Sequence, residues 1–201
     1  MGDGARAYFA TGSFAAGARL VEAISRLPGV EDQLADVDLR HGGVTVRLIT
    51  YSDDWYGMST RDVELCAQIS ALAREQGLSA DPSVVQTVEP LIIDALDIPA
   101  VMPFWRALLD YEYRRDNPGE DLVDPRGRGP SVWFQQMDAP RPQRNRIHIA
   151  VWVPYEQAEA RVAAAIAAGG QLVTDQYAPS WWVLADPEGN EADVATAMGR
   201  D

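Results

Sequence analysis

The sequence contains no lysine, a single cysteine and only two histidines, and all 17 of its basic residues are arginine. Without lysine, the chain cannot form a Schiff base, use a lysine general base or carry a Walker A phosphate-binding lysine. The lone cysteine, Cys66, excludes an internal disulfide and any multi-cysteine metal site. With His41 and His148 as the only imidazoles, one chain cannot build a site from three histidines.

Long apolar runs are also missing. No run approaches the roughly 18 residues of a membrane span, and the first residues lack the apolar core of a signal peptide, so we expect a cytoplasmic protein. The net charge is −13, with 30 acidic residues. This charge disfavours nucleic acid and anionic membranes as partners, because both attract excess cation. A small-molecule ligand is the expected partner, and the sequence leaves undecided whether the chain forms a homodimer. The arginine-rich, lysine-free composition is typical of a GC-rich bacterial genome.

The first part of the chain reads as an antiparallel sheet with two helices. Phe14, Ala18, Val21, Ile24 and Leu27 recur at helical spacing and predict one apolar helix face. A capping sequence at Ser59–Asp62 predicts the start of the second helix. The expected strands are 6–10, 36–40 and 44–51, the expected helices 13–27 and 59–76, and the expected linker 79–83. His41 is interpreted as a turn residue, and Cys66 as a small core residue rather than a nucleophile.

The rest of the chain contains an internal repeat. Glu89 and His148 are 148 − 89 = 59 residues apart, and Gln135 and Asp193 are 193 − 135 = 58 apart. Each copy predicts a strand, a helix and further strands, so the pattern favours two βαβββ modules. The first copy is expected at strand 85–96, helix 99–109 and strands ending at 132–135; the second at strand 145–153, helix 155–168 and strands 171–174, 181–185 and 191–195. The expected fold class is α+β, with domains at 1–79 and 84–201.

Residues 85–197 resemble the vicinal-oxygen-chelate superfamily of glyoxalases, extradiol dioxygenases and bleomycin-resistance proteins. The resemblance rests on Phe104–Leu109, Asn145–His148 and Asp186–Asn190. It implies paired βαβββ modules with up to four metal ligands on the inward strand faces. Carried onto this chain, the second, third and fourth positions are Gln135, His148 and Asp193. The first falls at Pro90, which cannot ligate, with Glu89 beside it.

Residues 6–78 resemble pterin-4a-carbinolamine dehydratase through Asp38–Arg40, Val44–Val46 and Gly57–Asp62. The resemblance implies histidines just before the Asp38 strand, where this chain has Gln33-Leu34-Ala35, and after the second strand, near Thr50–Asp53. Every catalytic imidazole of that family is therefore missing. We expect the fold of the dehydratase without its activity, because no pair remains to shuttle the proton.

Strand periodicity predicts an aromatic, polar-tipped cavity around the candidate residues. Trp152 shares a face with His148, Trp133 and Met137 share one with Gln135, and Glu191 shares one with Asp193. A packed β core is the alternative reading of the same pattern. The Asp186–Asn190 motif predicts a hairpin turn.

Arginines near this predicted cavity have two open interpretations. Arg144 and Arg146 could clamp an anionic ligand, or they could be a solvated surface pair. The loop 117–130, with Arg126 and Arg128, could be a lid or a plain surface loop.

Three functions remain open from the sequence. The first hypothesis is a small-molecule-binding protein with no tightly bound cofactor, whose cavity includes Trp133, Gln135, Met137, Trp152 and Asp193. The second is a lyase, isomerase or dioxygenase that holds a divalent metal on His148, Asp193 and Gln135, with His148 and Glu191 as catalytic residues. The third is a dimeric interaction protein. Whether the chain is an enzyme stays undecided; if it is one, the activity expected is of glyoxalase or dioxygenase type rather than carbinolamine dehydration.

Overall fold

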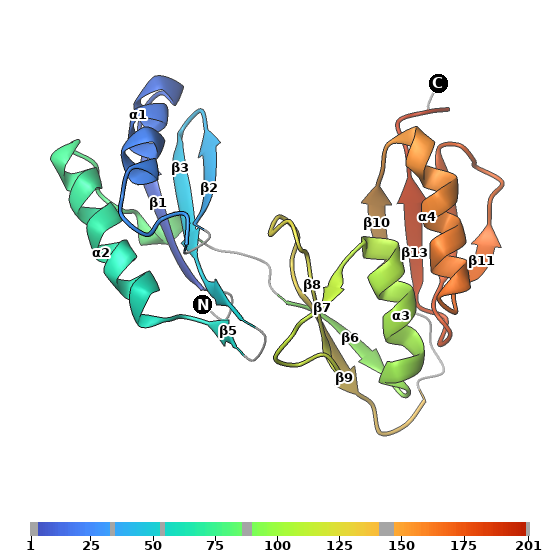
Figure 1. Ribbon diagram of the computed structural model, residues 1–201. Helices are drawn as coiled ribbons and strands as arrows, with labels where there is room; N and C mark the ends of the chain where they lie inside the picture. The colour runs from blue at the N-terminus through green and yellow to red at the C-terminus, as the bar shows by residue number, and fades with distance from the viewer. Residues whose placement is uncertain (1–3, 33–34, 53–54, 86–89, 141–146, 200–201) are drawn as a thin grey trace. The chain divides into compact units, whose positions relative to one another are not determined.

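The chain is α+β, as expected, and divides into two units, Met1–Val88 and Glu89–Asp201. A computed structural model of the chain describes residues 4–32, 35–52, 55–85, 90–140 and 147–199 (Figure 1). Among these residues, no helix is long and apolar enough to span a membrane. Each unit has its own hydrophobic core, so the two are described separately.

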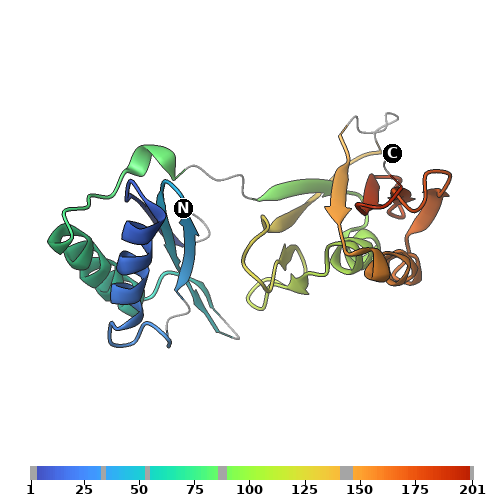
Figure 2. The same cartoon turned by 90° about the horizontal axis from the view of Figure 1, so that it is seen from above.

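The first unit is a three-stranded antiparallel sheet with two helices on one face. The sheet order is β1-β3-β2, and α1 and α2 lie next to each other against it (Figures 1 and 2). Its main elements are β1 (Ala5–Ala10), α1 (Phe14–Ser25), β2 (Asp36–Arg40), β3 (Gly43–Leu48) and α2 (Thr60–Glu75). The predicted strand 44–51 is split, because β3 ends at Leu48 and a short hairpin follows. The smaller elements are β4 (Thr50–Tyr51), β5 (Tyr56–Gly57) and the 3-10 helix η1 (Pro82–Val84).

Sequence spacing misplaced one end of the apolar face of α1. Gly17, Leu20 and Ile24 are the buried residues of this helix, whereas Phe14, predicted to lie in the core, is 56% exposed. Gly17 lets α1 approach β2 closely, since a Cβ at this position would lie 2.4 Å from Leu39 Cδ1. The contact with the sheet is therefore centred on a residue that no apolar pattern marks.

The second unit confirms the predicted pair of βαβββ modules. Both sheets have the same order, β6-β9-β8-β7 and β10-β13-β12-β11, and in each the first and last strands are parallel. The first module consists of β6 (Leu91–Ala95), α3 (Ile98–Leu109), β7 (Glu112–Tyr113), β8 (Asp121–Val123) and β9 (Val132–Gln136). The second consists of β10 (Ile149–Trp152), α4 (Tyr155–Ala167), β11 (Gln171–Thr174), β12 (Trp181–Ala185) and β13 (Glu191–Ala195).

One shared core joins the two modules through their helices. Phe104 and Leu108 of α3 and Ala158 and Ala165 of α4 are fully buried in it, together with the helix-facing residues of both sheets. The other side of each sheet faces away from the helices, and this side positions the candidate site. We call these sides the first open face, with Ile92, Asp94, Trp133 and Gln135, and the second open face, with His148, Ala150, Trp152, Trp181, Val183, Glu191, Asp193 and Ala195.

Candidate functional site

The second open face gathers most of the predicted site residues. Strand pairing aligns Trp152, Ala195 and Trp181 in one row across β10, β13 and β12. The next row is Ala150, Asp193 and Val183. His148 directly precedes β10, and Glu191 begins β13, so both lie at the same end of this face. The predicted alternation of these residues is thus realised on one surface.

His148 and Asp193 form a direct pair. The His148 Nε2 atom lies 3.2 Å from Asp193 Oδ2, and the two side chains are 54% and 13% exposed. Burial raises the pKa of the Asp193 carboxyl; His148 lowers this pKa and Glu191 raises it. An imidazole with one accessible side and a carboxylate behind it can hold a proton, orient a polar ligand, or do both.

Aromatic side chains border this pair. Trp152 is 59% exposed, which is a large apolar area for a strand residue. On the far side of the row, the Tyr177 ring stacks on Trp181 with centroids 4.4 Å apart and an interplanar angle of 19°. Ala195, between the two tryptophans, is buried and small. Ala195 is 3% exposed, so the row is an aromatic surface without an open slot between the indoles.

The first open face carries the remaining predicted cavity residues, and the structure does not join them to the pair. Among the described contacts, none links Gln135 to His148 or Asp193; Gln135 is exposed on β9 beside Asp94. Trp133 is half-buried, and its Nε1 donates to Glu120 Oε2 at 3.4 Å. Met137 is half-buried just past β9, where its backbone N donates to Ala95 O. The single cavity spanning both modules stays a prediction.

The register also moves the first implied metal position. Asp94 pairs with Gln135 in the first module, as Ala150 pairs with Asp193 in the second. His148 is two residues before Ala150, so its equivalent is Ile92, two residues before Asp94. The sequence alignment had put Pro90 there, and Glu89 lies outside the described residues. Ile92 cannot ligate, and the described part of the chain contains no group of three His, Cys, Asp or Glu side chains that could hold a metal. The described residues therefore do not form a site for a resident metal ion.

The arginine loop of the first module is held by one acid. Asp124 accepts from the backbone N–H groups of Arg126, Arg128 and Gly129 and from Arg126 Nε. Burial alone would raise the pKa of Asp124, but these hydrogen bonds outweigh it and lower the pKa. Arg126 also pairs with Asp110 at 2.7 Å. These contacts favour the surface-loop interpretation of residues 117–130.

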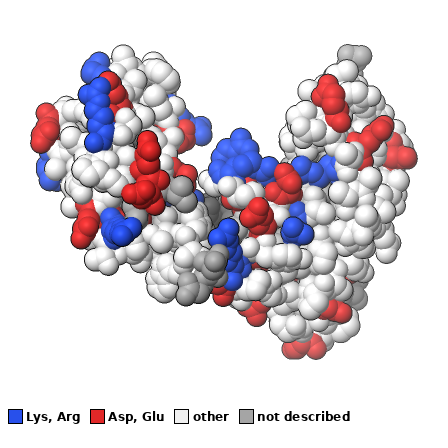
Figure 3. All heavy atoms as spheres, in the orientation of Figure 1, with Lys and Arg blue, Asp and Glu red and all other residues white. Residues whose placement is uncertain are grey.

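Arginine side chains gather over the β7–β8 side of the second unit in Figure 3, and acidic side chains lie among them. The ion pairs of Arg114 with Asp116 and Asp121 have the same mixed character. Arg144 and Arg146, the other predicted clamp, lie outside the described residues.

A hollow that sequence reasoning missed lies between α3 and α4, with a volume of about 450 Å³. Its floor includes Ala160 and Ala164, and Arg161 at its side donates to Leu108 O at 2.9 Å and approaches Asp110 at 3.4 Å. Small residues on facing helices could have signalled the close approach. Because Arg161 donates to the backbone near the end of α3, we interpret the hollow as a feature of helix packing.

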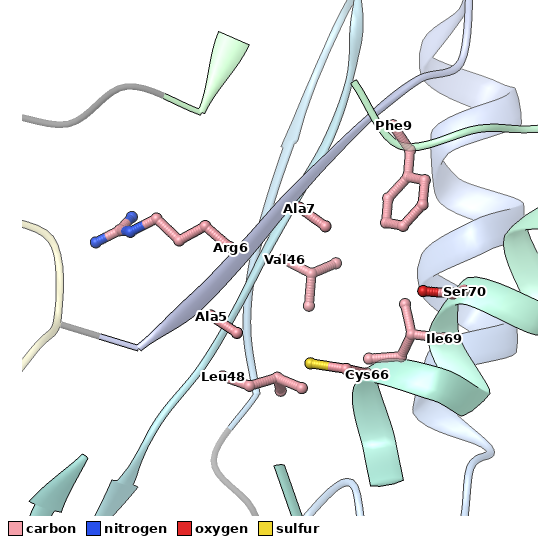
Figure 4. A pocket seen from close by; sticks show the side chains of 9 residues that line it. All are labelled: Ala5, Arg6, Ala7, Phe9, Val46, Leu48, Cys66, Ile69 and Ser70. Atoms are coloured by element: carbon pink, nitrogen blue, oxygen red, sulfur yellow. The ribbon is translucent and has the colours of Figure 1, made fainter. Parts of the chain in front are cut away.

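The first unit has a small cavity of about 50 Å³ between β1, β3 and α2 (Figure 4). The Cys66 thiol points into it toward Leu48 and Ala5. Burial raises the pKa of this thiol, and the charge of Asp62 raises it further. A thiol that resists ionisation is a poor nucleophile, which agrees with the predicted core role.

The positions implied by the dehydratase resemblance are only partly described. Gln33, Leu34 and Asp53 lie outside the described residues. His41 follows the last residue of β2, in the exposed turn before β3, as expected for a turn residue.

Comparison with known proteins gives one sequence match. The model of a family described as "Glyoxalase-like domain" matches residues 90–195, which is more than half of the chain. No curated protein matches the sequence.

Three solved structures with similarity to this chain cover between 54% and 56% of it. A glyoxalase-related enzyme from Fulvimarina pelagi is 19% identical, covers 56% of this chain and 88% of its own, and has a TM-score of 0.45. A glyoxalase/bleomycin resistance protein/dioxygenase family enzyme from Burkholderia phytofirmans PsJN is 20% identical, with coverages of 54% and 96% and a TM-score of 0.43. A mutant of the fosfomycin resistance protein FosX from Listeria monocytogenes, complexed with Mn(II) and 1S,2S-dihydroxypropylphosphonic acid, is 12% identical, with coverages of 56% and 90% and a TM-score of 0.41. None of these likenesses decides what the chain does.

Proposed function

We propose a function for this chain from the premise that it belongs to the family of glyoxalase-like domains, whose model matches residues 90–195. The second unit binds a small organic molecule on its second open face. The observation that carries the proposal is the His148–Asp193 pair, 3.2 Å apart, on the same face as the exposed Trp152. A face that only packed a core would hide this tryptophan and would have no use for a half-exposed imidazole.

The pair and the aromatic row have complementary tasks in such a site. The indoles of Trp152 and Trp181 supply apolar contact area, and the His148–Asp193 pair fixes the orientation of a polar group on the ligand. Asp193 is mostly covered, and its contact with His148 keeps the ring in one orientation. The site is thus a shallow apolar surface with one polar corner.

Binding can be tested by screening small organic molecules against the full chain by thermal shift and titrating the hits by tryptophan fluorescence. We expect Trp152→Ala to lower the affinity for a ligand of this site by roughly tenfold or more, since the substitution removes most of one aromatic contact. Trp55 is 52% exposed in the other unit, so Trp55→Ala is the matched control and should leave affinity unchanged. If substitutions of Trp152, His148 and Asp193 all left the affinity unchanged, the binding site would have to lie elsewhere.

The enzymatic alternative uses the same face. His148 and Glu191 would move protons, and a divalent metal on His148, Asp193 and Gln135 would activate the substrate. The position of Ile92 argues against this metal set, and so does the lack of any contact between Gln135 and the pair among the described contacts. We therefore rank binding above metal-dependent catalysis. The third hypothesis, a dimeric interaction protein, stays a prediction that sedimentation of the purified chain would check.

For the first unit, we propose a dehydratase-like domain without dehydratase activity. The support is the sequence, which has Gln33-Leu34-Ala35 where the dehydratase resemblance implies catalytic histidines. Purified protein should not accelerate carbinolamine dehydration above the uncatalysed rate. Measurable turnover that scales with protein concentration would disprove this.

A further inference from the structure

The hollow between α3 and α4 has a rim that helix packing does not explain. It lies where the end of α3 meets the first part of α4, and its volume of about 450 Å³ is in the range of small-molecule sites. Packing accounts for the alanines of the lining and for Arg161, whose guanidinium is engaged with Leu108 O and Asp110. Two other charged residues line the same hollow, Arg106 of α3 and Glu156 of α4.

Arg106 and Glu156 carry opposite charges but do not pair. Both side chains are exposed, and neither forms an ion pair or a hydrogen bond with a described residue. The Arg106 guanidinium lies over the Tyr113 ring, 4.9 Å from its centroid, so the ring holds the cation and leaves its N–H donors without an acceptor among the described residues. One cation and one anion on the same hollow are therefore both available to a ligand.

Each of these charges also complements the dipole of its own helix. Arg106 lies in the last turn of α3 and Glu156 in the first turn of α4, which are the favourable ends for a cation and an anion. That task affects helix stability only, and it does not require the two residues to line one hollow. Measured affinities therefore separate a binding role from a dipole role.

The distance between the helices sets the length of a ligand that reaches both charges. Packed helices have axes about 8–10 Å apart, so the charged groups of the ligand must themselves be several ångströms apart. In a free amino acid the ammonium and carboxylate groups are attached to one carbon, whereas each further extended residue separates them by about 3.3–3.6 Å more. Apart from the charged residues, the lining is neutral, with Ala107, Tyr111, Gln157, Ala160 and Ala164.

We propose that the hollow between α3 and α4 binds short peptides with free ends, of about dipeptide length. The Arg106 guanidinium binds the peptide carboxylate, Glu156 binds the terminal ammonium group, and the neutral lining contacts the peptide backbone. The hollow is on the helix side of the second sheet, opposite the second open face. This second site is therefore independent of the proposed function, and either can fail without the other.

Three probes of similar size test the recognition of the two ends: alanyl-alanine, its N-acetyl derivative and its C-terminal amide. The probes are titrated into the full chain at neutral pH, and backbone amide shifts are followed by NMR. Alanyl-alanine should bind weakly, with a Kd on the order of 1 mM, because the site is open. Removing either charge should lower the affinity roughly three- to fivefold, and free alanine should bind more weakly than the dipeptide.

Variants assign each end of the peptide to one residue. Arg106→Gln should reduce the affinity for alanyl-alanine to that for the amide and should not affect the amide itself. Glu156→Gln should do the same with respect to the N-acetyl derivative. The matched controls are Arg74→Gln, in the last turn of α2, and Glu159→Gln, an exposed acid of α4 outside the hollow; both should leave all affinities unchanged.

The site is supported if the shifted amides cluster around Ala160 and Ala164 and each variant affects only the probe that carries the matching charge. Equal affinities for the three probes, or no binding of alanyl-alanine at about 20 mM, would overturn the proposal. Affinities that Arg106→Gln and Glu156→Gln leave unchanged would also overturn it, since the two charges would then serve only their own helices. The amide spectrum of each variant shows in the same experiment that the chain is folded.

Discussion

Asp186 combines several structural tasks in one buried carboxylate. It is 1% exposed, and its carboxylate accepts from Trp105 Nε1, the backbone N–H groups of Glu188 and Asn190, and Asn190 Nδ2. Trp105 belongs to α3 of the first module, whereas Asp186 directly follows β12 of the second. The predicted hairpin turn is therefore also a clasp between modules.

Removing this carboxylate should be costly. We predict that Asp186→Ala destabilises the chain by about 2–4 kcal/mol, because buried donors lose their acceptor. Trp105→Phe removes one donor and keeps most of the packing, so a loss of about 1 kcal/mol is expected. Urea unfolding measures both. No measurable loss in Trp105→Phe would show that the clasp is not important for stability.

Asp193 should make stability depend on pH. Its pKa is raised in the folded state, chiefly by burial, so the folded chain holds this proton to higher pH than the unfolded chain does. Stability therefore falls as pH rises from the ordinary carboxyl range through the raised value, and the penalty is fully present above it. We predict that Asp193→Asn is more stable than the wild type at neutral pH and that the difference disappears below the ordinary carboxyl range.

Calorimetric Tm values measured from about pH 3 to about pH 8 would test this. The exposed Glu159 gives a charge-matched control through Glu159→Gln, which should show no such divergence. If the Tm curves of the wild type and Asp193→Asn diverged at acid pH rather than at neutral pH, the pH dependence would have the opposite sign. The raised pKa of Asp193 would then not explain it.

At the scale of elements, two hairpins repeat one turn. Asp124 and Asp186 each accept from the backbone N–H groups two and four residues ahead, and Gly127 and Gly189 each have positive φ. The two acids are 186 − 124 = 62 residues apart. This Asp-Pro-x-Gly repeat is visible in the sequence and is a stronger signal of module duplication than the two offsets that predicted it.

The β2–β3 hairpin gives a prediction with an adjacent control. A Cβ on Gly43 would lie 2.4 Å from the backbone oxygen of Phe9, and neither strand can yield without breaking the sheet. We predict that Gly43→Ala costs roughly 1–3 kcal/mol. Gly42→Ala meets nothing closer than the Tyr8 hydroxyl at 3.4 Å and should stay within about 0.5 kcal/mol. Chemical unfolding measures the stability of both variants. Equal free energies of unfolding would show that the sheet is loosely packed at Gly43.

At the scale of the whole molecule, the candidate site depends on one module more than on the pair. The His148–Asp193 pair and the aromatic row lie within the second sheet, whereas the metal hypothesis requires residues of both sheets. Two strong ligands cannot hold an ion against exchange, and a neutral amide does not replace an anionic ligand.

We therefore predict that the purified protein contains no tightly bound transition metal. Elemental analysis after dialysis is the measurement, with His148→Ala as the comparison. About one equivalent of Fe, Mn, Ni or Zn per chain that is lost in His148→Ala would contradict the prediction and promote the enzymatic alternative.

Local patterns in the sequence predicted most of the elements and the faces of the strands. The strands 36–40, 171–174, 181–185 and 191–195 were predicted with the bounds that the structure shows, and the paired modules were predicted from a period of about 60 residues. Alternation along a strand needs no tertiary knowledge, because successive side chains point to opposite faces. This is why His148 with Trp152, and Asp193 with Glu191, were grouped correctly from sequence.

Contacts between elements were decided by the tertiary structure. The register of β6 on β9 makes Ile92, rather than Pro90, the equivalent of His148 in the first module. This register depends on pairing between residues 41 positions apart, such as Asp94 and Gln135 (135 − 94 = 41). The exposure of Phe14 follows from the approach of α1 to β2 at Gly17, and the clasp of Asp186 to Trp105 joins two modules. Sequence periodicity reports which side of its own element a residue faces; what lies opposite that side is determined by packing at long range.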